Sequence, residues 1–361
     1  MDIVYDGCIY RMQRAGGINR YFAEIISRLP LEWTPLLIGA NDLGRMPPSH
    51  PNLVIRKGPS FRPRRVSGRI AGAMWSHYIS RRAALLHPTY YDLCDGLSLR
   101  KVRCPVVMTV QDFSYAVYAE ITDQAEHVIR SQREAVLRAD HVICVSKSTE
   151  ERLLERIPEA AGKTSVIHHG TAFRPNGARE DGGRIRFLYI GARARYKNFA
   201  LALHAFAKAA RSCPEIKMTV AGPPLESHER WQLHLLGVAK LVDVEVYPDE
   251  NRLKHLYCQS TALLYPSQHE GFGHPPLEAM ACGAIAVTSN TTSLPEVVGD
   301  AGIMLDPASV DDWASCIIAI AKGTLDRTEY VKRGFLRASR FSWDTSFQKH
   351  LAIYKRIAQP S

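Results

Sequence analysis

Short apolar runs alternate with helical patterns along most of the chain. Several of these runs are apolar at successive positions, which is typical of strands buried on both faces of a parallel sheet. The predicted strands span residues 2–6, 35–38, 106–110, 141–145, 164–168, 186–190, 217–221, 242–247, 262–265, 284–289 and 302–305. Between two of them, residues 197–212 form a predicted helix that places on one face Phe199, Leu203, Phe206 and Ala210.

The alternation of strands and helices occurs twice, which predicts an α/β fold built from two doubly wound domains. The segment 171–183 is rich in proline, glycine and charge and is the predicted linker. The domains then span residues 1–170 and 184–342, and a last helical segment follows at 343–361. Two serine–glutamate pairs have the spacing of capping boxes at helix starts: Ser148 with Glu151, and Ser293 with Glu296.

The stretch 264–298 carries the most informative chemistry. A predicted buried strand runs into a loop, and Pro275 and Pro276 then open a helix, where proline is tolerated. Gly271 and Gly273 in the loop allow backbone amides to approach a ligand closely. The start of the helix adds partial positive charge, so this loop is a candidate ligand site.

Two glutamates flank the helix start. Glu270 lies in the loop after the strand, where doubly wound folds bind ligands. Glu278 lies one turn into the helix, where a carboxylate can accept hydrogen bonds from vicinal hydroxyls such as those of a ribose. The alternative for Glu278 is a glutamate that only stabilises the helix dipole.

A second candidate site is the segment 191–198, GARARYKN. It again follows a predicted strand, with a glycine and then a basic loop that opens a helix. Arg193, Arg195 and Lys197 supply cations that can neutralise a diphosphate at a helix start. The alternative is a basic loop without a ligand on a basic protein.

The third candidate is the glycine pair Gly16 and Gly17 at the first strand-to-helix turn. Such a pair admits a phosphate or sugar against the backbone, but it also simply makes tight turns. The run is not GxGxxG, so a nicotinamide dinucleotide site is not indicated. The chain has no Asp-x-Asp, so no carboxylate site for a metal on a diphosphate is predicted. It also has no G-x-S-x-G and no P-loop GxxxxGK[ST].

The segment EGFGHPPLEAMACGAIAVTSNTTSLPEVVGDAG resembles the donor-site region of retaining glycosyltransferases of family 4, which have the GT-B fold. GGINRYFAEI, HPTYY, VQDFSY, VSKST and IGARARYKN also occur in the order of that family, so the resemblance covers nearly the whole chain. It implies two Rossmann-like domains facing a cleft, with a nucleotide sugar held mainly by the second. It also implies that the last helix crosses back to the first domain.

The resemblance assigns roles to residues of this chain. The expected catalytic residues are Glu270, Lys197, Arg193, Gln111 and Asp112. The expected donor-binding residues are Gly16, Gly17, Arg195, Lys197, Gly271, Phe272, Gly273, His274 and Glu278. Within this set, Glu278 is expected to bind the ribose, and Lys197 with one of the two arginines the diphosphate. No metal and no other cofactor is expected.

Two positions depart from the family pattern. The family usually has His-Asp where this chain has Gln111 and Asp112. Glutamine can donate and accept hydrogen bonds but does not titrate near neutral pH. Either the histidine is not an essential base, or the donor or activity of this chain is unusual. Tyr196 stands where an arginine often precedes the lysine, and Arg193 or Arg195 is expected to compensate.

The net charge of +10 is concentrated in one part of the chain. No acidic residue occurs between Asp42 and Asp92, whereas residues 43–91 hold many lysines and arginines. Such a field attracts anionic lipid headgroups or other polyanions, and the run 70–75 (IAGAMW) beside arginines suits a membrane surface. The alternative is a solvated basic surface. Nucleic-acid binding is not expected, because no RNP-like, zinc-finger or basic heptad motif is present.

The cysteines and the N-terminus bear on the compartment. Eight scattered cysteines without a CxxC pair indicate reduced, mostly buried thiols in a cytosol. No apolar run approaches the length of a membrane span, and acidic residues occupy the place of a signal peptide's bases. We therefore expect a cytoplasmic protein at the inner face of the cytoplasmic membrane.

The predicted function is a retaining, metal-independent transfer of a hexose from a nucleoside-diphosphate sugar to a lipid-linked saccharide in bacterial surface polysaccharide synthesis. A GDP-sugar such as GDP-mannose is preferred as donor, and a UDP-sugar is the alternative. Two other hypotheses remain open: a catalytically impaired protein that binds sugar nucleotides, and a sugar phosphorylase or sucrose-type synthase on the same fold.

Overall fold

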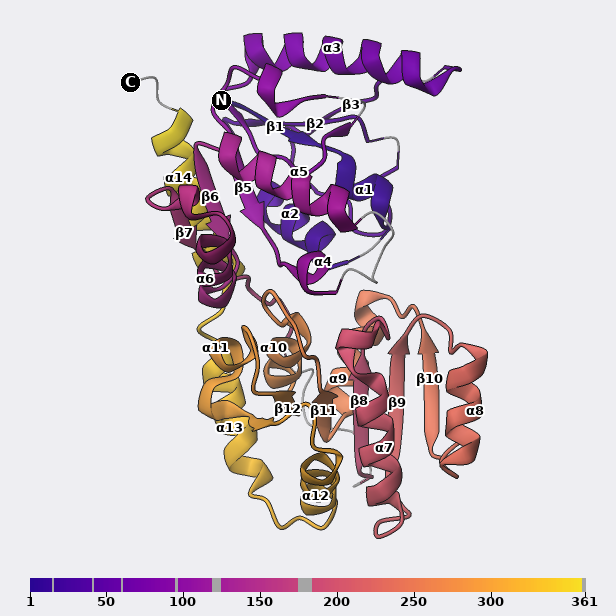
Figure 1. Ribbon diagram of the computed structural model, residues 1–361. Helices are drawn as coiled ribbons and strands as arrows, with labels where there is room; N and C mark the ends of the chain where they lie inside the picture. Colours follow the sequence, from indigo (N-terminus) through magenta and orange to yellow (C-terminus); the bar gives the residue numbers. More distant parts are fainter. Residues whose placement is uncertain are drawn as a thin grey trace. The chain divides into compact units, whose positions relative to one another are not determined.

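The computed structural model describes residues 1–14, 16–40, 42–59, 61–94, 97–118, 125–174 and 184–358. The chain divides into two compact units (Figure 1). Unit 1 comprises Met1–Gly170 with Trp343–Ser361, and unit 2 comprises Thr171–Ser342. Most of the predicted linker, residues 175–183, lies outside the described residues.

Unit 1 contains a parallel sheet in two sections. One section has the order β3-β2-β1-β4 and the other β5-β6-β7, and a parallel bridge between Leu86 and Val106 joins them. The strands are β1 (Asp2–Asp6), β2 (Thr34–Ile38), β3 (Val54–Arg56), β4 (Leu85–Leu86), β5 (Val107–Val110), β6 (His141–Cys144) and β7 (Thr164–Val166). The strand order therefore reverses between β1 and β4, where a doubly wound sheet opens a crevice for ligands.

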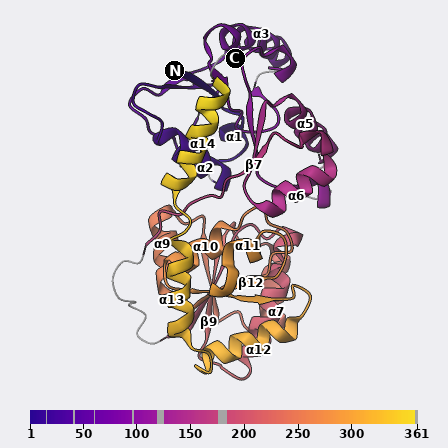
Figure 2. The same cartoon turned by 90° about the vertical axis from the view of Figure 1, so that its left-hand side faces the viewer.

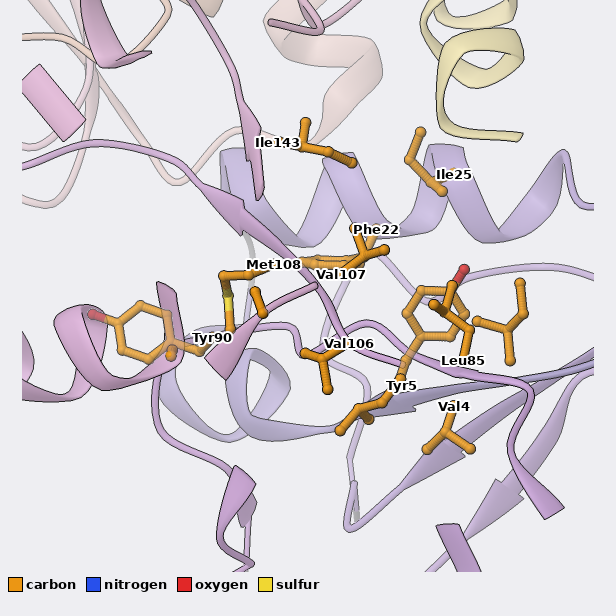
Figure 3. Packing of buried hydrophobic residues seen from close by; sticks show 14 of the residues in the cluster. Val4, Tyr5, Phe22, Ile25, Leu85, Tyr90, Val106, Val107, Met108 and Ile143 are labelled. Atoms are coloured by element: carbon orange, nitrogen blue, oxygen red, sulfur yellow. The ribbon is translucent and has the colours of Figure 1, made fainter. Parts of the chain in front are cut away.

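Helices cover both faces of this sheet, with α2 and α14 on one side and α5 and α6 on the other (Figure 2). The α-helices are α1 (Cys8–Met12), α2 (Gly17–Ser27), α3 (Arg64–Arg82), α4 (Ser114–Val117), α5 (Ala125–Arg138), α6 (Lys147–Arg156) and α14 (Trp343–Ala358). The core between the layers is built from the apolar strands and the inner face of α2, including Tyr5, Phe22 and Val107 (Figure 3). Continuous apolar strands are buried here because both faces of the sheet are covered.

Unit 2 holds a single parallel sheet of order β10-β9-β8-β11-β12-β13. Its strands are β8 (Arg186–Ile190), β9 (Lys217–Gly222), β10 (Val242–Val246), β11 (Ala262–Tyr265), β12 (Ile285–Ser289) and β13 (Ile303–Leu305). The order reverses between β8 and β11, which is the arrangement of a Rossmann sheet. The carboxyl ends of these two strands therefore mark the expected ligand crevice of unit 2.

The helices of unit 2 also flank its sheet, with α9, α10 and α13 on one side and α7 and α12 on the other (Figure 2). They are α7 (Phe199–Ala210), α8 (Ser227–Leu235), α9 (Glu250–Gln259), α10 (His274–Ala281), α11 (Leu294–Val298), α12 (Val310–Ala321) and α13 (Arg327–Ala338). Phe199, Leu203, Phe206 and Ala210 of α7 are all buried, as the helical spacing predicted. The predicted α/β class with two doubly wound domains is confirmed.

The C-terminal helix α14 lies in unit 1 and is held there by a buried polar network. The Tyr21 hydroxyl of α2 is 2.6 Å from Nε2 of His350 and 2.8 Å from the Thr109 hydroxyl. The His87 ring joins Thr109 through Nε2 and the Tyr354 hydroxyl through Nδ1, at 2.8 and 2.6 Å. Burial lowers the pKa of His350 to about 4, so this ring is neutral at pH 7.

Both predicted capping boxes are wrong. Helix α6 begins two residues earlier than expected, and its cap is Ser146, whose hydroxyl accepts from the Thr149 amide. Ser293 caps no amide of α11; its hydroxyl donates to the carbonyls of Glu270 and Phe272, at 3.0 and 2.8 Å. The Ser293 hydroxyl bonds the carbonyls of this loop, so it does not form the capping box that the sequence predicted.

The basic segment 43–91 folds mainly into α3. The lysines and arginines of this segment whose side chains the structure describes are all exposed: Arg45, Arg56, Lys57, Arg62, Arg65, Arg69, Arg81 and Arg82. Trp75, which the sequence suggested for a membrane surface, is instead buried and meets Tyr78 edge to face. Among the described residues, no helix has the length and apolar character needed to cross a bilayer.

Candidate functional site

The predicted site residues divide between the two units. Gly16, Gly17, Gln111 and Asp112 belong to unit 1, and the other predicted residues belong to unit 2. The unit 2 group follows the ends of β8 and β11, at the reversal of strand order. This is where an open parallel sheet binds its ligands, so the topology supports the positions that the sequence indicated.

Lys197 and Glu270 form a buried ion pair at the centre of the unit 2 group. Nζ of Lys197 lies 2.6 Å from Oε1 of Glu270 and 3.3 Å from the Tyr265 hydroxyl. The two charged side chains keep only 16% and 11% of their surface exposed. Their positions come from η5 (Arg195–Lys197), a single 3-10 turn after β8, and from the loop after β11.

The charge of Lys197 is secure in this setting. Burial by itself opposes the ammonium, but the carboxylate of Glu270 outweighs burial and holds the pKa of Lys197 well above its usual range. The ammonium also lies 5.0 Å from the ring centroid of Tyr196 and 5.6 Å from that of Tyr265. Burial, with Glu270 nearby, raises the pKa of Tyr265, so its hydroxyl remains protonated.

The loop that carries Glu270 is fixed by side chains that follow β12. The Glu270 amide donates to the Thr292 hydroxyl at 3.0 Å, and Ser293 bonds the carbonyls of Glu270 and Phe272. Thr292 itself has a φ of 51°, which is rare for a β-branched residue and indicates that the loop dictates its conformation. Sequence reasoning gave Thr292 no role and took Ser293 for a helix cap, although both lie inside the most informative stretch.

The start of α10 follows this loop. Gly273 has a φ of 109°, and a Cβ there would lie 2.9 Å from Leu294, so glycine is required. Pro275 and Pro276 occupy the first turn as predicted, but they carry no N–H. The amide donors of this helix start are therefore reduced to those of Gly273 and His274.

Phe272 differs from its neighbours. Its ring is buried against Phe341, with centroids 5.9 Å apart, and its carbonyl accepts from Ser293. The side chain is thus a packing residue of unit 2. Gly271 is buried as well, so this part of the loop presents backbone more than side chain.

Glu278 is buried within unit 2, with 3% of its surface exposed. Its Oε2 accepts from the hydroxyl of Tyr257 in α9 at 2.9 Å. Tyr257 is fully buried and packs edge to face against Phe173. A tyrosine from a neighbouring helix therefore orients the carboxylate, and the spacing between the two glutamates gave no sign of it.

The two candidate arginines have different surroundings. Arg193 donates through Nε to Glu229 at 2.5 Å and through its two terminal nitrogens to the carbonyls of Pro223 and Pro224, at 2.9 and 2.6 Å. Its side chain is only 5% exposed. Arg195 is exposed on η5, two residues from Lys197. Most donors of Arg193 are thus used inside the protein, and Arg195 is the better candidate for a diphosphate.

The unit 1 residues lie at two other places. Gly16 and Gly17 begin α2, but the short helix α1 separates them from β1, so they are not directly at the end of that strand. Gln111 follows β5, and its amide Nε2 is buried with no hydrogen-bond partner among the described residues. The Asp112 carboxylate accepts from the amide and the hydroxyl of Ser114 at 3.0 and 2.8 Å, which is a local Asx-turn contact just before α4.

Comparison with known proteins places the two units in known families. Residues 15–172 match the model of Glycosyltransferase Family 4, and residues 172–337 match that of Glycosyl transferases group 1. Over 110 residues, 30% of this chain, the sequence is 44% identical to O-antigen chain mannosyltransferase B of Escherichia coli. Over 387 residues it is 23% identical to D-inositol 3-phosphate glycosyltransferase 2 of Catenulispora acidiphila, covering 95% of this chain and 90% of the relative.

The mannosyltransferase matches are partial. The matched part spans 29% of mannosyltransferase B and 13% of the serotype-specific mannosyltransferase WbdA of Escherichia coli, which is 39% identical over 108 residues. The chain thus matches less than two thirds of the length of these relatives.

Solved structures share the fold over almost the whole chain. Sucrose-phosphate synthase of Thermosynechococcus elongatus is 19% identical with a TM-score of 0.78, covering 99% of this chain and 98% of that one. HepE of Anabaena, solved in complex with UDP and glucose, is 17% identical with a TM-score of 0.76, covering 98% and 99%.

Proposed function

Because the chain belongs to the glycosyltransferases of the GT-B fold, with a family 4 domain followed by a group 1 domain, we propose that it transfers a hexose from a nucleoside-diphosphate sugar to a lipid-linked saccharide. The observation that carries the proposal is the buried pair of Lys197 and Glu270 at the reversal of strand order in unit 2. A secured ammonium at that place suits the binding of a departing diphosphate.

Each residue of the unit 2 group has a role in this proposal. The contacts described for Lys197 use two of its three N–H donors, so the third can reach a phosphate oxygen while the pair with Glu270 persists. Arg195 adds a second cation. Glu278, oriented by Tyr257, accepts from the ribose hydroxyls, and Glu270 with the backbone of Gly271–His274 holds the sugar.

The reaction breaks the bond between the anomeric carbon and the diphosphate oxygen and forms a bond from that carbon to the acceptor oxygen. We assign retention of configuration, with the departing phosphate oxygen taking the acceptor proton on the same face. Lys197, Arg195 and the start of α10 stabilise the charge that develops on the diphosphate. These groups do the work of a metal on the diphosphate, in keeping with the absence of Asp-x-Asp from the sequence.

For the donor we propose a GDP-sugar, GDP-mannose first, with a UDP-sugar as the alternative. The O-antigen mannosyltransferase relatives support a mannose donor and a surface-polysaccharide acceptor. The alternative is supported by the fold relative HepE, which was solved with UDP-glucose. Gln111 is the reason to keep a catalytically impaired sugar-nucleotide-binding protein as a second candidate, since its unpartnered amide fits binding and not proton transfer.

We also propose that unit 1 docks on an anionic membrane through α3, which would place the protein at the inner face of the cytoplasmic membrane. Val66, Ile70 and Met74 are spaced four residues apart on this helix and are 45%, 49% and 41% exposed. Arg65 and Arg69 are exposed beside them. Apolar side chains in a row between arginines suit the boundary of headgroups and acyl chains.

The docking is tested by sedimentation with vesicles of phosphatidylcholine, with and without phosphatidylglycerol. We expect binding only to the anionic vesicles, and a loss in the triple variant Val66→Ser, Ile70→Ser, Met74→Ser. Leu336→Ser, which changes a side chain 59% exposed in unit 2, is the matched control. Equal binding of the triple variant and the wild type contradicts this docking surface.

The activity is tested by incubating the purified chain with GDP-, UDP-, dTDP- and ADP-sugars, without added metal and with a chelator, and measuring nucleoside diphosphate release. Release from one class of donor supports the transferase and identifies the base, and Lys197→Met is expected to lower the rate of release by about 100-fold or more. Absence of release and of nucleotide binding rejects the donor site. If the chain binds a nucleotide but releases no nucleoside diphosphate even when acceptor extracts are added, the catalytically impaired binding protein is favoured.

A further inference from the structure

A cluster of potential metal ligands lies in unit 1, at the reversal of strand order between β1 and β4. A carboxylate oxygen of Asp6, at the end of β1, and the Sγ atoms of Cys8 and Cys94 all lie within 4.8 Å of one another. Cys8 begins α1, and Cys94 lies between β4 and η2 (Leu99–Lys101) along the chain. The cluster thus occupies the carboxyl edge of the sheet at the position where doubly wound domains bind ligands.

The backbone fixes the two cysteines beside each other. The amides of Cys8 and Cys94 both donate to the same oxygen, Oδ2 of Asp6, each at 3.2 Å. Oδ1 accepts from the amide and the hydroxyl of Thr89, at 2.6 and 3.1 Å. One buried carboxylate therefore holds the start of α1 and both ends of the loop 89–94, and the two thiols face a common space.

The charge of this cluster is unbalanced. Asp6 is 0% exposed, all its hydrogen-bond partners are neutral, and the described residues give it no ion pair. Four hydrogen bonds from neutral donors compensate part of the cost of burying this carboxylate, and no described cation pairs with it. Two thiolates and a carboxylate carry three negative charges, of which one divalent cation neutralises two.

We propose that Asp6, Cys8 and Cys94 bind a thiophilic divalent cation of the zinc type. Tetrahedral zinc with bonds of about 2.0–2.3 Å needs its ligand atoms about 3.5–3.8 Å apart, so side-chain rotation of roughly an ångström closes the site. Binding releases the two thiol protons to solvent. Cys8 is half-buried, which leaves an entry path and a fourth position for water.

The ion has a structural role in unit 1, separate from the donor residues of unit 2. It fastens the loop 89–94 to the end of β1. That loop also carries Tyr91, whose hydroxyl accepts from the backbone amide of Gln111 at 3.3 Å. The site therefore fixes the support of Gln111, and neither the chemistry on the diphosphate nor the proposed transfer depends on it.

The test uses the purified full chain, freed of metal by dialysis against a chelator and titrated with Co²⁺ and with Zn²⁺ in competition. We expect one ion per chain and a thiolate-to-cobalt charge-transfer band. Cys8→Ser and Cys94→Ser are expected to lose the charge-transfer band. Their affinity for the ion is expected to fall by at least about 10–100-fold, which is the cost of losing an outer-shell partner of a metal site. Cys258→Ser, which changes the other half-buried cysteine, keeps both and is the matched control.

A measurement on the wild type guards against variants that fail to fold. Zn²⁺ is expected to slow alkylation of Cys8, followed by peptide mass spectrometry, without slowing that of Cys258. The proposal is overturned if the wild type shows no stoichiometric band, if the Cys8 and Cys94 variants bind as the wild type does, or if the purified chain holds a Cys8–Cys94 disulfide.

Discussion

The ion pair of Lys197 and Glu270 allows a structural effect and a catalytic effect to be separated. Lys197→Met keeps the length of the side chain and its packing beside Tyr196 and Tyr265, but it removes the charge. Glu270 is then a carboxylate that is 11% exposed without its partner. The double variant Lys197→Met, Glu270→Gln removes both charges and leaves no isolated ion.

The expected magnitudes follow from burial. Removing one partner of a buried pair costs about 3–5 kcal/mol, and the residual exposure here points to the lower end, about 3 kcal/mol. The double variant recovers most of this loss, because the isolated carboxylate is gone. Turnover does not recover: both variants lose about 100-fold or more, the cost of removing one preorganised donor from a developing oxyanion.

The dependence of this contribution on pH is also fixed. The pKa of Lys197 is raised above the ordinary lysine value, so the stabilisation is complete below about pH 10. It is lost only as the pH rises through the raised value. Titration of Lys197 therefore adds no pH dependence, across neutral pH, to the stability difference between the wild type and Lys197→Met.

Hydrogen exchange of the β8 and β11 amides is the appropriate assay, because it reports the stability of unit 2 without assuming that both units unfold together. Donor turnover is measured on the same samples. The reasoning is refuted if Lys197→Met exchanges as slowly as the wild type, or if the double variant regains turnover together with stability.

Three further predictions concern other contacts. Tyr257→Phe removes the hydroxyl that orients Glu278, so the Kd for the nucleoside diphosphate is expected to rise by about 10-fold at most. Turnover at saturating donor is expected to be unchanged. An unchanged Kd contradicts this role of Tyr257. Arg195→Ala lowers turnover, whereas Arg193→Ala mainly lowers the thermal midpoint because it leaves Glu229 unpaired; the opposite pattern reverses the assignment. Burial lowers the pKa of folded His350 to about 4, so its stabilisation is complete above about pH 6.5 and declines by about 2 kcal/mol by pH 5. The stability difference between the wild type and His350→Gln measures this decline, and a difference independent of pH contradicts it.

The sheet strands could be predicted well from the sequence because they are continuous apolar runs. The exceptions have physical reasons. β3 (Val54–Arg56) is a three-residue edge strand with two exposed positions, and β4 (Leu85–Leu86) has only two residues, so neither gives a run long enough to detect. Both are set by pairing with neighbouring strands, which a local pattern does not record.

The site residues could be predicted as positions but not as contacts. The strand-loop-helix pattern located Lys197, Glu270 and Glu278, since glycines, prolines and strand ends are local signals. The partners Tyr257, Thr292 and Ser293 come from other elements, and their types are equally common in packing and capping. The choice between Arg193 and Arg195 depended on Glu229, which is 36 residues away along the chain.

The surface predictions were limited in the same way. The charge of the segment 43–91 was visible, but the sequence suggested Trp75 as its interfacial residue, and that side chain is buried. On a helix of 19 residues, composition does not decide which face packs against the domain. The exposed row of Val66, Ile70 and Met74 became visible only once the buried face was known.

The central claim is that unit 2 binds a nucleoside diphosphate through Glu278 and the group around Lys197. Calorimetric titration of the full chain with GDP and with UDP tests it most directly, with Glu278→Gln as the isosteric variant. The account predicts one site for one of the two nucleotides in the wild type, and an affinity lower by about 10-fold or more in the variant, as expected for a charged hydrogen bond. Absence of binding of either nucleotide, or equal affinity in the variant, would contradict it.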